Sequence, residues 1–306
     1  MGDTSSTRRA LDEALRRIRR FTFIQIQGMA QLATERARHA YLHAIAACAV
    51  ERIDALAEMV QTGKTHPLRD VRLAETFPSV RENGNPLRVG FYALAANPLH
   101  WGHILVGLTA LVLMRLDRVV FVVAGADPRK PFLLTAEDRH RLAREVIDTF
   151  EPFFAYSPIA LGTDLDGETN LGRLLALNPH LHMHAFYIAG SDHYRRRNER
   201  GEPDTIEKLE CLAGGLRSAA GPEQSLSAVF VDRPGQSARP GHIDTFLDIH
   251  VLPAMPLVCS STAARHALCE GKFTEALTSV PYATFAEIQS LRLYHGGQAC
   301  HESKTA

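Results

Sequence analysis

The sequence has little of what marks secreted, membrane-spanning or nucleic-acid-binding proteins. Its 34 basic residues are balanced by 34 acidic ones, so charge gives no reason to expect a nucleic-acid or membrane partner. No apolar run is long enough to cross a bilayer. The first residues carry no apolar signal core, and RRALDEALRRIRR has instead the pattern of a charged amphipathic helix.

Cysteine is also scarce in this chain of 306 residues. The cysteines are odd in number and lack the paired spacing of a zinc site; they are Cys48, Cys211, Cys259, Cys269 and Cys300. We therefore expect reduced thiols in a cytoplasmic protein. What the chain does have is an ordinary globular composition, 45% hydrophobic and 22% charged, which is enough apolar material for a sizeable core.

The pattern of apolar residues divides the chain in two. Residues 1–85 form a helical region and linker, because apolar residues recur there at spacings of three and four before a proline-punctuated stretch. Residues 86–306 alternate short apolar runs with helical patterns, which is typical of a mostly parallel sheet with crossover helices. We predict a Rossmann-like α/β fold preceded by helices that brace the sheet or support a homo-oligomer.

The HLHMH stretch, His180 to His184, spaces three imidazoles by two. On a strand they would share one face, as a metal site requires. The stretch follows Asn178-Pro179 and leads into an apolar run, so we favour the start of a surface strand and assign no metal-ligating residues.

The NPLHWGH segment, Asn97 to His103, follows the first apolar run of the second part. If a helix begins near Trp101, His100 and His103 share one face beside its N-terminus, where free backbone N–H groups and the helix dipole favour an anion. Gly102 has no side chain, so a ligand can approach the backbone closely. This context favours phosphate binding over two buried core histidines.

A second segment, SSTAAR, follows the last predicted strand. Ser and Thr at a helix start are first of all caps. Arg265 then lies one turn into that helix, where its guanidinium can bind phosphate in bidentate fashion.

The order NPLHWGH, PRKP, GSD, DRPG and SSTAAR resembles the nicotinate/nicotinamide mononucleotide adenylyltransferases, a family of HxGH nucleotidyltransferases. The resemblance covers roughly residues 87 to 294. It implies adenylyl transfer from ATP to a pyridine mononucleotide, by direct in-line attack, with Mg²⁺ as cofactor. His100, His103, Lys130 and Arg265 match its catalytic residues. The matching ATP-binding residues are Gly102, Gly190, Asp192, Arg233, Pro234, Ser260, Ser261 and Thr262.

The turn before Asn97 departs from the family pattern, which usually has Gly-Gly-Ser/Thr-Phe where this chain has Ala93, Leu94, Ala95 and Ala96. Alanine in place of glycine keeps the N–H group but adds a Cβ that disfavours positive φ. The family also has a tryptophan some residues after its Gly-x-Asp, whereas the single tryptophan here is Trp101. We therefore expect the acceptor to be bound by Ala95, Ala96, Asn97, Trp101 and Tyr194. Two alternatives stay open: another phosphorylated acceptor, such as pantetheine phosphate, and a nucleotide-binding protein without catalysis.

Overall fold

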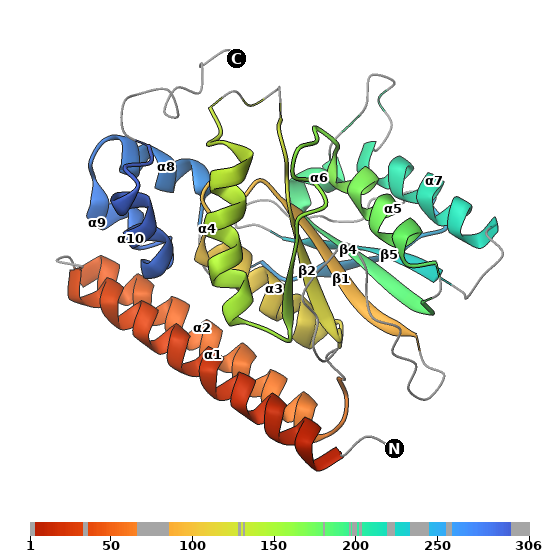
Figure 1. Cartoon of the computed structure of the whole chain (residues 1–306), viewed down its shortest axis with the longest axis horizontal. Helices are drawn as coiled ribbons and strands as arrows, with labels where there is room; N and C mark the ends of the chain where they lie inside the picture. Colours follow the sequence, from red (N-terminus) through yellow and green to blue (C-terminus); the bar gives the residue numbers. More distant parts are fainter. Residues whose placement is uncertain are drawn as a thin grey trace.

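The computed structural model describes most of both predicted parts. The described residues are 4–32, 36–65, 86–127, 130, 132–179, 181–195, 197, 201, 204–218, 224–232, 245–254 and 259–294. The chain begins with two long helices, α1 (Thr4–Leu32) and α2 (Arg36–Gln61), which lie side by side as an antiparallel hairpin (Figure 1). An α/β unit follows, so the predicted order of a helical region before a Rossmann-like fold is confirmed.

The α/β unit is built on a six-stranded, parallel sheet in the order β3-β2-β1-β4-β5-β6. Its strands are β1 (Leu87–Leu94), β2 (Arg118–Val123), β3 (Phe154–Ser157), β4 (Met183–Gly190), β5 (Gln224–Val231) and β6 (Asp248–Leu252). Every residue of β2 is buried, as expected for a central strand covered on both faces. Strand order reverses beside β1, and ligands of such sheets bind beyond the carboxyl ends of the strands at that point.

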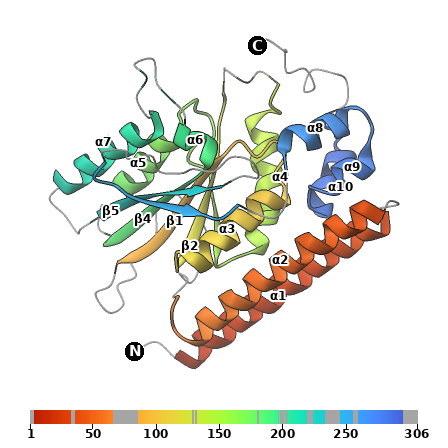
Figure 2. The same ribbon diagram turned by 180° about the vertical axis from the view of Figure 1, so that it is seen from behind.

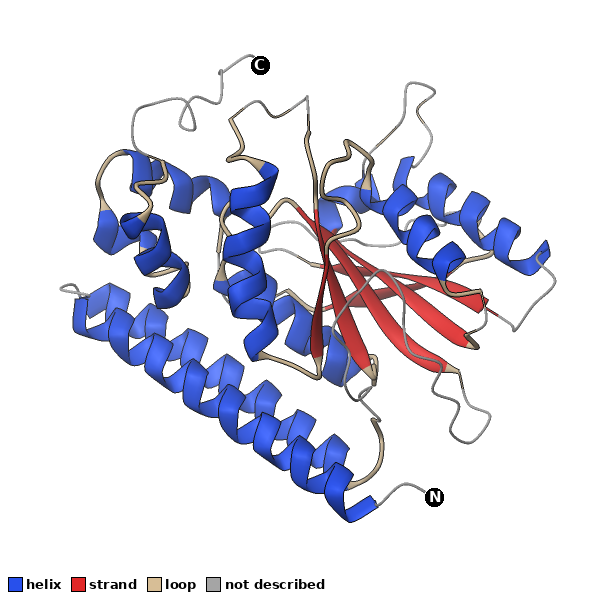
Figure 3. Cartoon of the chain, viewed as in Figure 1, coloured by secondary structure: helices blue, strands red, loops and turns tan. Residues whose placement is uncertain are grey.

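Helices cover the two faces of the sheet (Figures 1 to 3). They are α3 (Trp101–Leu113), α4 (Ala136–Thr149), α5 (Gly167–Leu177), α6 (Ser191–Arg195), α7 (Asp204–Ser218), α8 (Ser261–Cys269), α9 (Phe273–Ala276) and α10 (Tyr282–Ser290). The α3 side and the α5–α7 side enclose separate apolar cores. Thr135 caps α4, because its hydroxyl accepts the Asp138 N–H at 3.1 Å.

The N-terminal hairpin is part of the core on the α3 side. Ile18 of α1 and Ile45 of α2 are fully buried and share one apolar cluster with Leu105 of α3. The side chain of Arg17 reaches the last turn of α4, where it donates to the Thr149 carbonyl at 3.3 Å. We expected these helices either to brace the sheet or to support a homo-oligomer, and these contacts brace the sheet. The domain boundary at residues 85 and 86 stays a prediction.

The cysteines correct one expectation. Cys48, Cys211 and Cys259 carry free thiols, as predicted. Cys269, at the end of α8, is disulfide-bonded, so the prediction of reduced thiols throughout is wrong for this residue. Cys300 lies outside the described residues. No helix in the described ranges combines the length and hydropathy that a bilayer-spanning segment needs.

His184, from the HLHMH stretch, lies within β4 rather than in a metal site. Its Nε2 is 2.7 Å from the Ser227 hydroxyl, and its ring stacks on Phe186 with centroids 4.1 Å apart. No three His, Cys, Asp or Glu side chains converge on a metal position anywhere in the described ranges. His180 is outside them.

We expect His184 to make the protein less stable in acid. Burial, reinforced by the Arg88 guanidinium and by His250, lowers the pKa of His184 from 6.5 to about 4, and Asp248 only partly opposes this. The unfolded imidazole therefore binds a proton below pH 6.5, while the folded one does so only below about pH 4. The free energy of unfolding therefore rises by about 1 to 3 kcal/mol as pH increases from about 4 to 6.5. This added stability is lost as pH falls back through the same range.

Replacing His184 with Gln removes this titration and keeps a partner for Ser227. Urea denaturation across the same pH window should give a smaller pH dependence for the variant than for the parent. Equal dependence in both proteins would show that His184 does not titrate as argued.

Candidate active site

The two predicted phosphate-binding segments meet at the carboxyl edge of the sheet. The NPLHWGH segment forms the turn between β1 and α3, and SSTAAR forms the start of α8. The Ser261 hydroxyl donates to the Pro98 carbonyl at 3.1 Å, and Arg265 Nη1 donates to the Asn97 carbonyl at 3.3 Å. Residues more than 160 positions apart in the chain are thus joined directly.

Arg265 is buried rather than exposed. Only 3% of the residue is accessible, and the guanidinium lies over the Phe132 ring, 4.8 Å from its centroid. Its Nη2 is 3.5 Å from the Thr262 hydroxyl, a long contact that a better acceptor such as a phosphate oxygen could replace. Ser260 caps α8, as the sequence predicts, by accepting the Ala263 N–H at 3.3 Å.

His100 and His103 are stacked face to face. Their ring centroids are 3.7 Å apart with 18° between the planes. His103 Nδ1 accepts the His100 backbone N–H at 3.2 Å, so one ring nitrogen of His103 caps the helix. His103 also contacts the edge of Tyr92, with centroids 6.1 Å apart. Two imidazoles in this arrangement could contact phosphate oxygens together.

The first N–H groups of α3 correct an expectation. The sequence predicts that they are free for an anion, but the Trp101 N–H donates to the Ser279 carbonyl at 2.8 Å. The His103 N–H donates to the His100 carbonyl at 2.9 Å. A Cβ on Gly102 would lie 2.8 Å from the Cys259 Cβ and 2.9 Å from the His100 ring. The missing side chain therefore serves packing inside the protein.

Two predicted acceptor-binding residues lie in the core. Trp101 is fully buried beneath the hairpin, and its Nε1 donates to the Met29 thioether at 3.3 Å. Tyr194 is 5% exposed and packs edge to face against Phe230, with centroids 5.1 Å apart. Both rings are therefore covered by the protein itself, and their expected role in acceptor binding stays a prediction.

The remaining predicted residues follow strands that end at the same edge. Lys130 lies after β2, half-exposed, with its Nζ 3.8 Å from an Asp127 carboxylate oxygen. Gly190 is the last residue of β4, and Asp192 is exposed in the first turn of α6. Arg233 and Pro234 lie outside the described residues.

The turn that precedes Asn97 contains a backbone feature that the sequence flagged. Ala96 adopts φ +49°, the left-handed region in which a Cβ is unfavourable. Ala95 and Ala96 both belong to the same turn as Asn97. The predicted acceptor-binding turn therefore keeps, with alanine, a conformation that suits glycine.

Arg139 is a central residue of this site that sequence reasoning missed. It is 1% exposed, and its guanidinium donates to the carbonyls of Ala95 at 2.7 Å, Ala124 at 2.8 Å, Leu134 at 3.1 Å and also Gly125. One side chain thereby fixes the turns after β1 and β2 and the start of α4. Burial lowers the pKa of Arg139, and Tyr294 and the nearby carboxylates oppose this. Nothing in the TAEDRHRLARE pattern separates this arginine from a solvated one.

Tyr294 is the second missed residue. Its hydroxyl donates to Asn97 Oδ1 at 2.8 Å, and the Leu134 N–H donates to the same oxygen at 3.2 Å. Burial raises the pKa of Tyr294, so the hydroxyl stays protonated and remains a donor. Its position at the end of SLRLY, the last segment of the family resemblance, was the one signal available.

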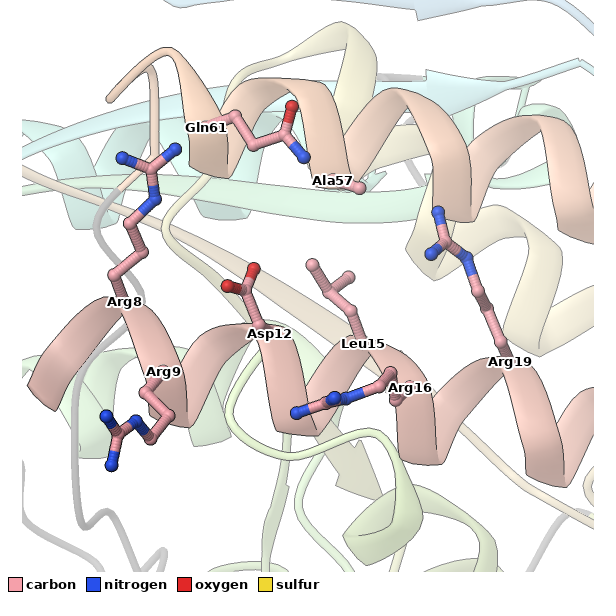
Figure 4. Close-up of a pocket in the computed structure, with 8 residues that line it drawn as sticks. All are labelled: Arg8, Arg9, Asp12, Leu15, Arg16, Arg19, Ala57 and Gln61. Atoms are coloured by element: carbon pink, nitrogen blue, oxygen red, sulfur yellow. The ribbon is translucent and has the colours of Figure 1, made fainter. Parts of the chain in front are cut away.

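A surface hollow on the hairpin contains none of these residues. Figure 4 shows it between α1 and α2, lined by four arginines of α1 together with Asp12, Leu15, Ala57 and Gln61. Arg16 and Arg19 are paired there with Glu13 and Asp54, at 2.7 and 2.6 Å. The hollow is a solvated charged face, separate from the candidate active site.

Comparison with known proteins agrees with the fold and the motifs. The chain is 32% identical over 215 residues to a probable nicotinate-nucleotide adenylyltransferase of Thermus thermophilus, covering 68% of this chain and all of that protein. A protein of the same name from Roseiflexus castenholzii is 27% identical over 218 residues, covering 68% of this chain and 98% of the relative. The chain matches no protein-family model.

Solved structures show the same fold. The nicotinic acid mononucleotide adenylyltransferase of Plasmodium falciparum, solved in complex with NaAD, aligns with a TM-score of 0.51 at 16% identity. The alignment covers 68% of this chain and 97% of that one. Fold, motifs and relatives together define a nucleotidyltransferase of NAD biosynthesis. The chain belongs to the nicotinate-nucleotide adenylyltransferase family.

Proposed function

We propose that the protein transfers the adenylyl group of ATP to nicotinate or nicotinamide mononucleotide, giving deamido-NAD or NAD and pyrophosphate. An oxygen of the acceptor's 5′-phosphate attacks the ATP α-phosphorus in line. The new P–O bond forms as the bond to the leaving pyrophosphate breaks, with no covalent enzyme intermediate. The observation that carries this proposal is the direct joining of the HxGH turn to SSTAAR through Ser261 and Arg265.

This geometry supports a division of roles among the residues. Chemistry of this type needs positioning and charge neutralisation rather than a protein nucleophile. His100 and His103 contact the ATP phosphates and stabilise charge that moves to the leaving group. Arg265 and Lys130 supply cationic donors, and the hydroxyls of Ser260, Ser261 and Thr262 bind the outer phosphates. The turn from Ala95 to Asn97 receives the acceptor phosphate.

In this proposal Mg²⁺ binds through the phosphates of ATP. The described residues offer no cluster of three metal-ligating side chains, so they do not fit a resident Mg²⁺ held by the protein. Mg²⁺ commonly keeps several waters and binds through substrate phosphates. We therefore assign no step to a protein ligand of the metal.

The direct test is an assay with ATP, Mg²⁺ and each mononucleotide in turn. We expect pyrophosphate release and a dinucleotide product, resolved by chromatography, with nicotinate mononucleotide the better acceptor because the curated relatives are named for it. No dinucleotide with either acceptor would overturn the proposal.

A second candidate acceptor class follows from the altered turn. Ala93 and Leu94 stand where the family usually has Gly-Gly, and Ala96 in the same segment adopts φ +49°. Assaying pantetheine phosphate and other phosphorylated acceptors with ATP and CTP separates this candidate from the first. Nucleotide binding without turnover of any acceptor would instead favour a non-catalytic protein.

A further inference from the structure

One thiol connects the N-terminal hairpin to both walls of the candidate active site. Cys259 immediately precedes the α8 cap Ser260, and its sulfur is 3.0 Å from the hydroxyl of Tyr41 on α2. The same cysteine packs against Gly102 in the first turn of α3, where a Cβ on Gly102 would lie only 2.8 Å from the Cys259 Cβ. Three elements, α2, α3 and the start of α8, therefore meet at one partly buried residue, Cys259.

The contact between Tyr41 and Cys259 has the chemistry of a structural hydrogen bond. Burial raises the pKa of Cys259, and burial together with the thiol raises the pKa of Tyr41. Both groups therefore stay neutral near pH 7, so the contact is a neutral hydrogen bond and neither partner is a nucleophile. Space is also tight, because a Cβ on Gly102 would lie 2.8 Å from the Cys259 Cβ. There is therefore little room for Cys259 to shift toward α3.

From this geometry we propose that Tyr41 is a positioning residue for nucleotide binding. It acts through Cys259 to set the distance between the His100–His103 pair beside α3 and the SSTAAR segment at the start of α8. Tyr41 itself touches no substrate in this proposal. Its hydroxyl lies against the Cys259 sulfur, Cys259 packs against Gly102 at the start of α3, and the following Ser260 and Ser261 belong to the proposed phosphate-binding segment. The inference rests on the proposed function of that site.

The hairpin offers a matched control at another contact. Gln25 of α1 is buried and accepts the Ala283 N–H of α10 through its Oε1 at 2.6 Å. This hydrogen bond also attaches the hairpin to the rest of the protein, but it joins α1 to α10 and does not involve Cys259. A variant at Gln25 therefore separates loss of hairpin docking from loss of the Tyr41 bond.

The test compares Tyr41→Phe, Cys259→Ala and the double variant with Gln25→Met and the parent. We expect Tyr41→Phe to raise the KM for ATP by about 3- to 10-fold, the effect of losing one hydrogen bond of about 1 kcal/mol, with the KM for the mononucleotide unchanged. Gln25→Met should leave both KM values unchanged while lowering the melting temperature. The double variant should be no worse than the poorer single variant, because both changes break one connection.

Calorimetric binding of a non-hydrolysable ATP analogue gives a readout that does not depend on turnover. Weaker analogue binding by Tyr41→Phe than by Gln25→Met, at comparable melting temperatures, supports the positioning role even in a protein that fails to use pyridine mononucleotides. An active parent whose ATP KM and analogue affinity match those of Tyr41→Phe would overturn the inference alone. Additive effects in the double variant would also overturn it.

Discussion

Replacing His103 with Ala is expected to lower kcat by about 100-fold or more, the scale of a lost group that stabilises transition-state charge. The residue faces His100 in a stacked pair at the start of α3, beside the SSTAAR wall. In the proposed reaction its imidazole meets charge that grows as pyrophosphate leaves. Because this interaction strengthens in the transition state, kcat should fall more than the KM for ATP changes.

A second substitution tests the roles of the two ring nitrogens of His103 separately. His103 Nδ1 already accepts the His100 N–H, and an Asn side chain can keep that bond while removing the outer nitrogen. His103→Asn should therefore lose as much activity as His103→Ala but keep more stability. His43, exposed on α2, supplies the control: His43→Ala should leave kcat unchanged. Steady-state kinetics with ATP and the better acceptor decides, and a His103→Ala enzyme as fast as the parent would remove this residue from the mechanism.

Gly125→Ala is expected to lower the free energy of unfolding by about 3 kcal/mol or more, near the upper end for overpacking. A Cβ at this position would lie 2.1 Å from the carbonyl oxygens of both Ala160 and Thr163. Neither backbone can yield easily, because the Ala126 N–H also donates to the Thr163 carbonyl at 2.8 Å. Arg139 additionally binds the Gly125 carbonyl, so the strain would reach the turn after β1.

Gly215 provides the matched control for this substitution. It lies in α7, and nothing stands within 4 Å of the position that a Cβ would take. Gly215→Ala should therefore stabilise the protein by about 0.5 to 1 kcal/mol, the usual gain of Ala over Gly within a helix. Urea denaturation measures both. Equal stability of the Gly125→Ala variant and the parent would show that the two turns separate more easily than their contacts indicate.

The local parts of this protein are largely predictable from its sequence. Alternating apolar runs and helical patterns predicted the parallel sheet, and the serines of SSTAAR predicted the helix cap that Ser260 makes. The motifs NPLHWGH and SSTAAR predicted two walls of one site, which Ser261 and Arg265 do join. These features depend on residues close together in the chain, where periodicity, capping and turn chemistry act.

The placement of other residues depends on distant contacts. Trp101 looked available to a ligand because its neighbours in sequence form a binding motif. It is covered instead by Met29, 72 positions earlier, and no local pattern records that contact. Tyr194 likewise follows the GSD motif but turns into the core against Phe230. In the sequence Arg139 resembles any arginine of an amphipathic helix. Its role depends on the turns after β1 and β2, which the fold places around it.

The sequence by itself determined the family, the order of strands and helices, and the identity of the histidine and arginine side chains at the site. Only the tertiary structure decided which aromatic rings are buried, which backbone amides of α3 are occupied, and that Cys259 and Tyr41 tie the hairpin to the site. The physical reason is that these outcomes depend on which surfaces pack together. Local preference acts within a few residues, whereas burial and hydrogen-bond satisfaction are settled by segments far apart in the chain.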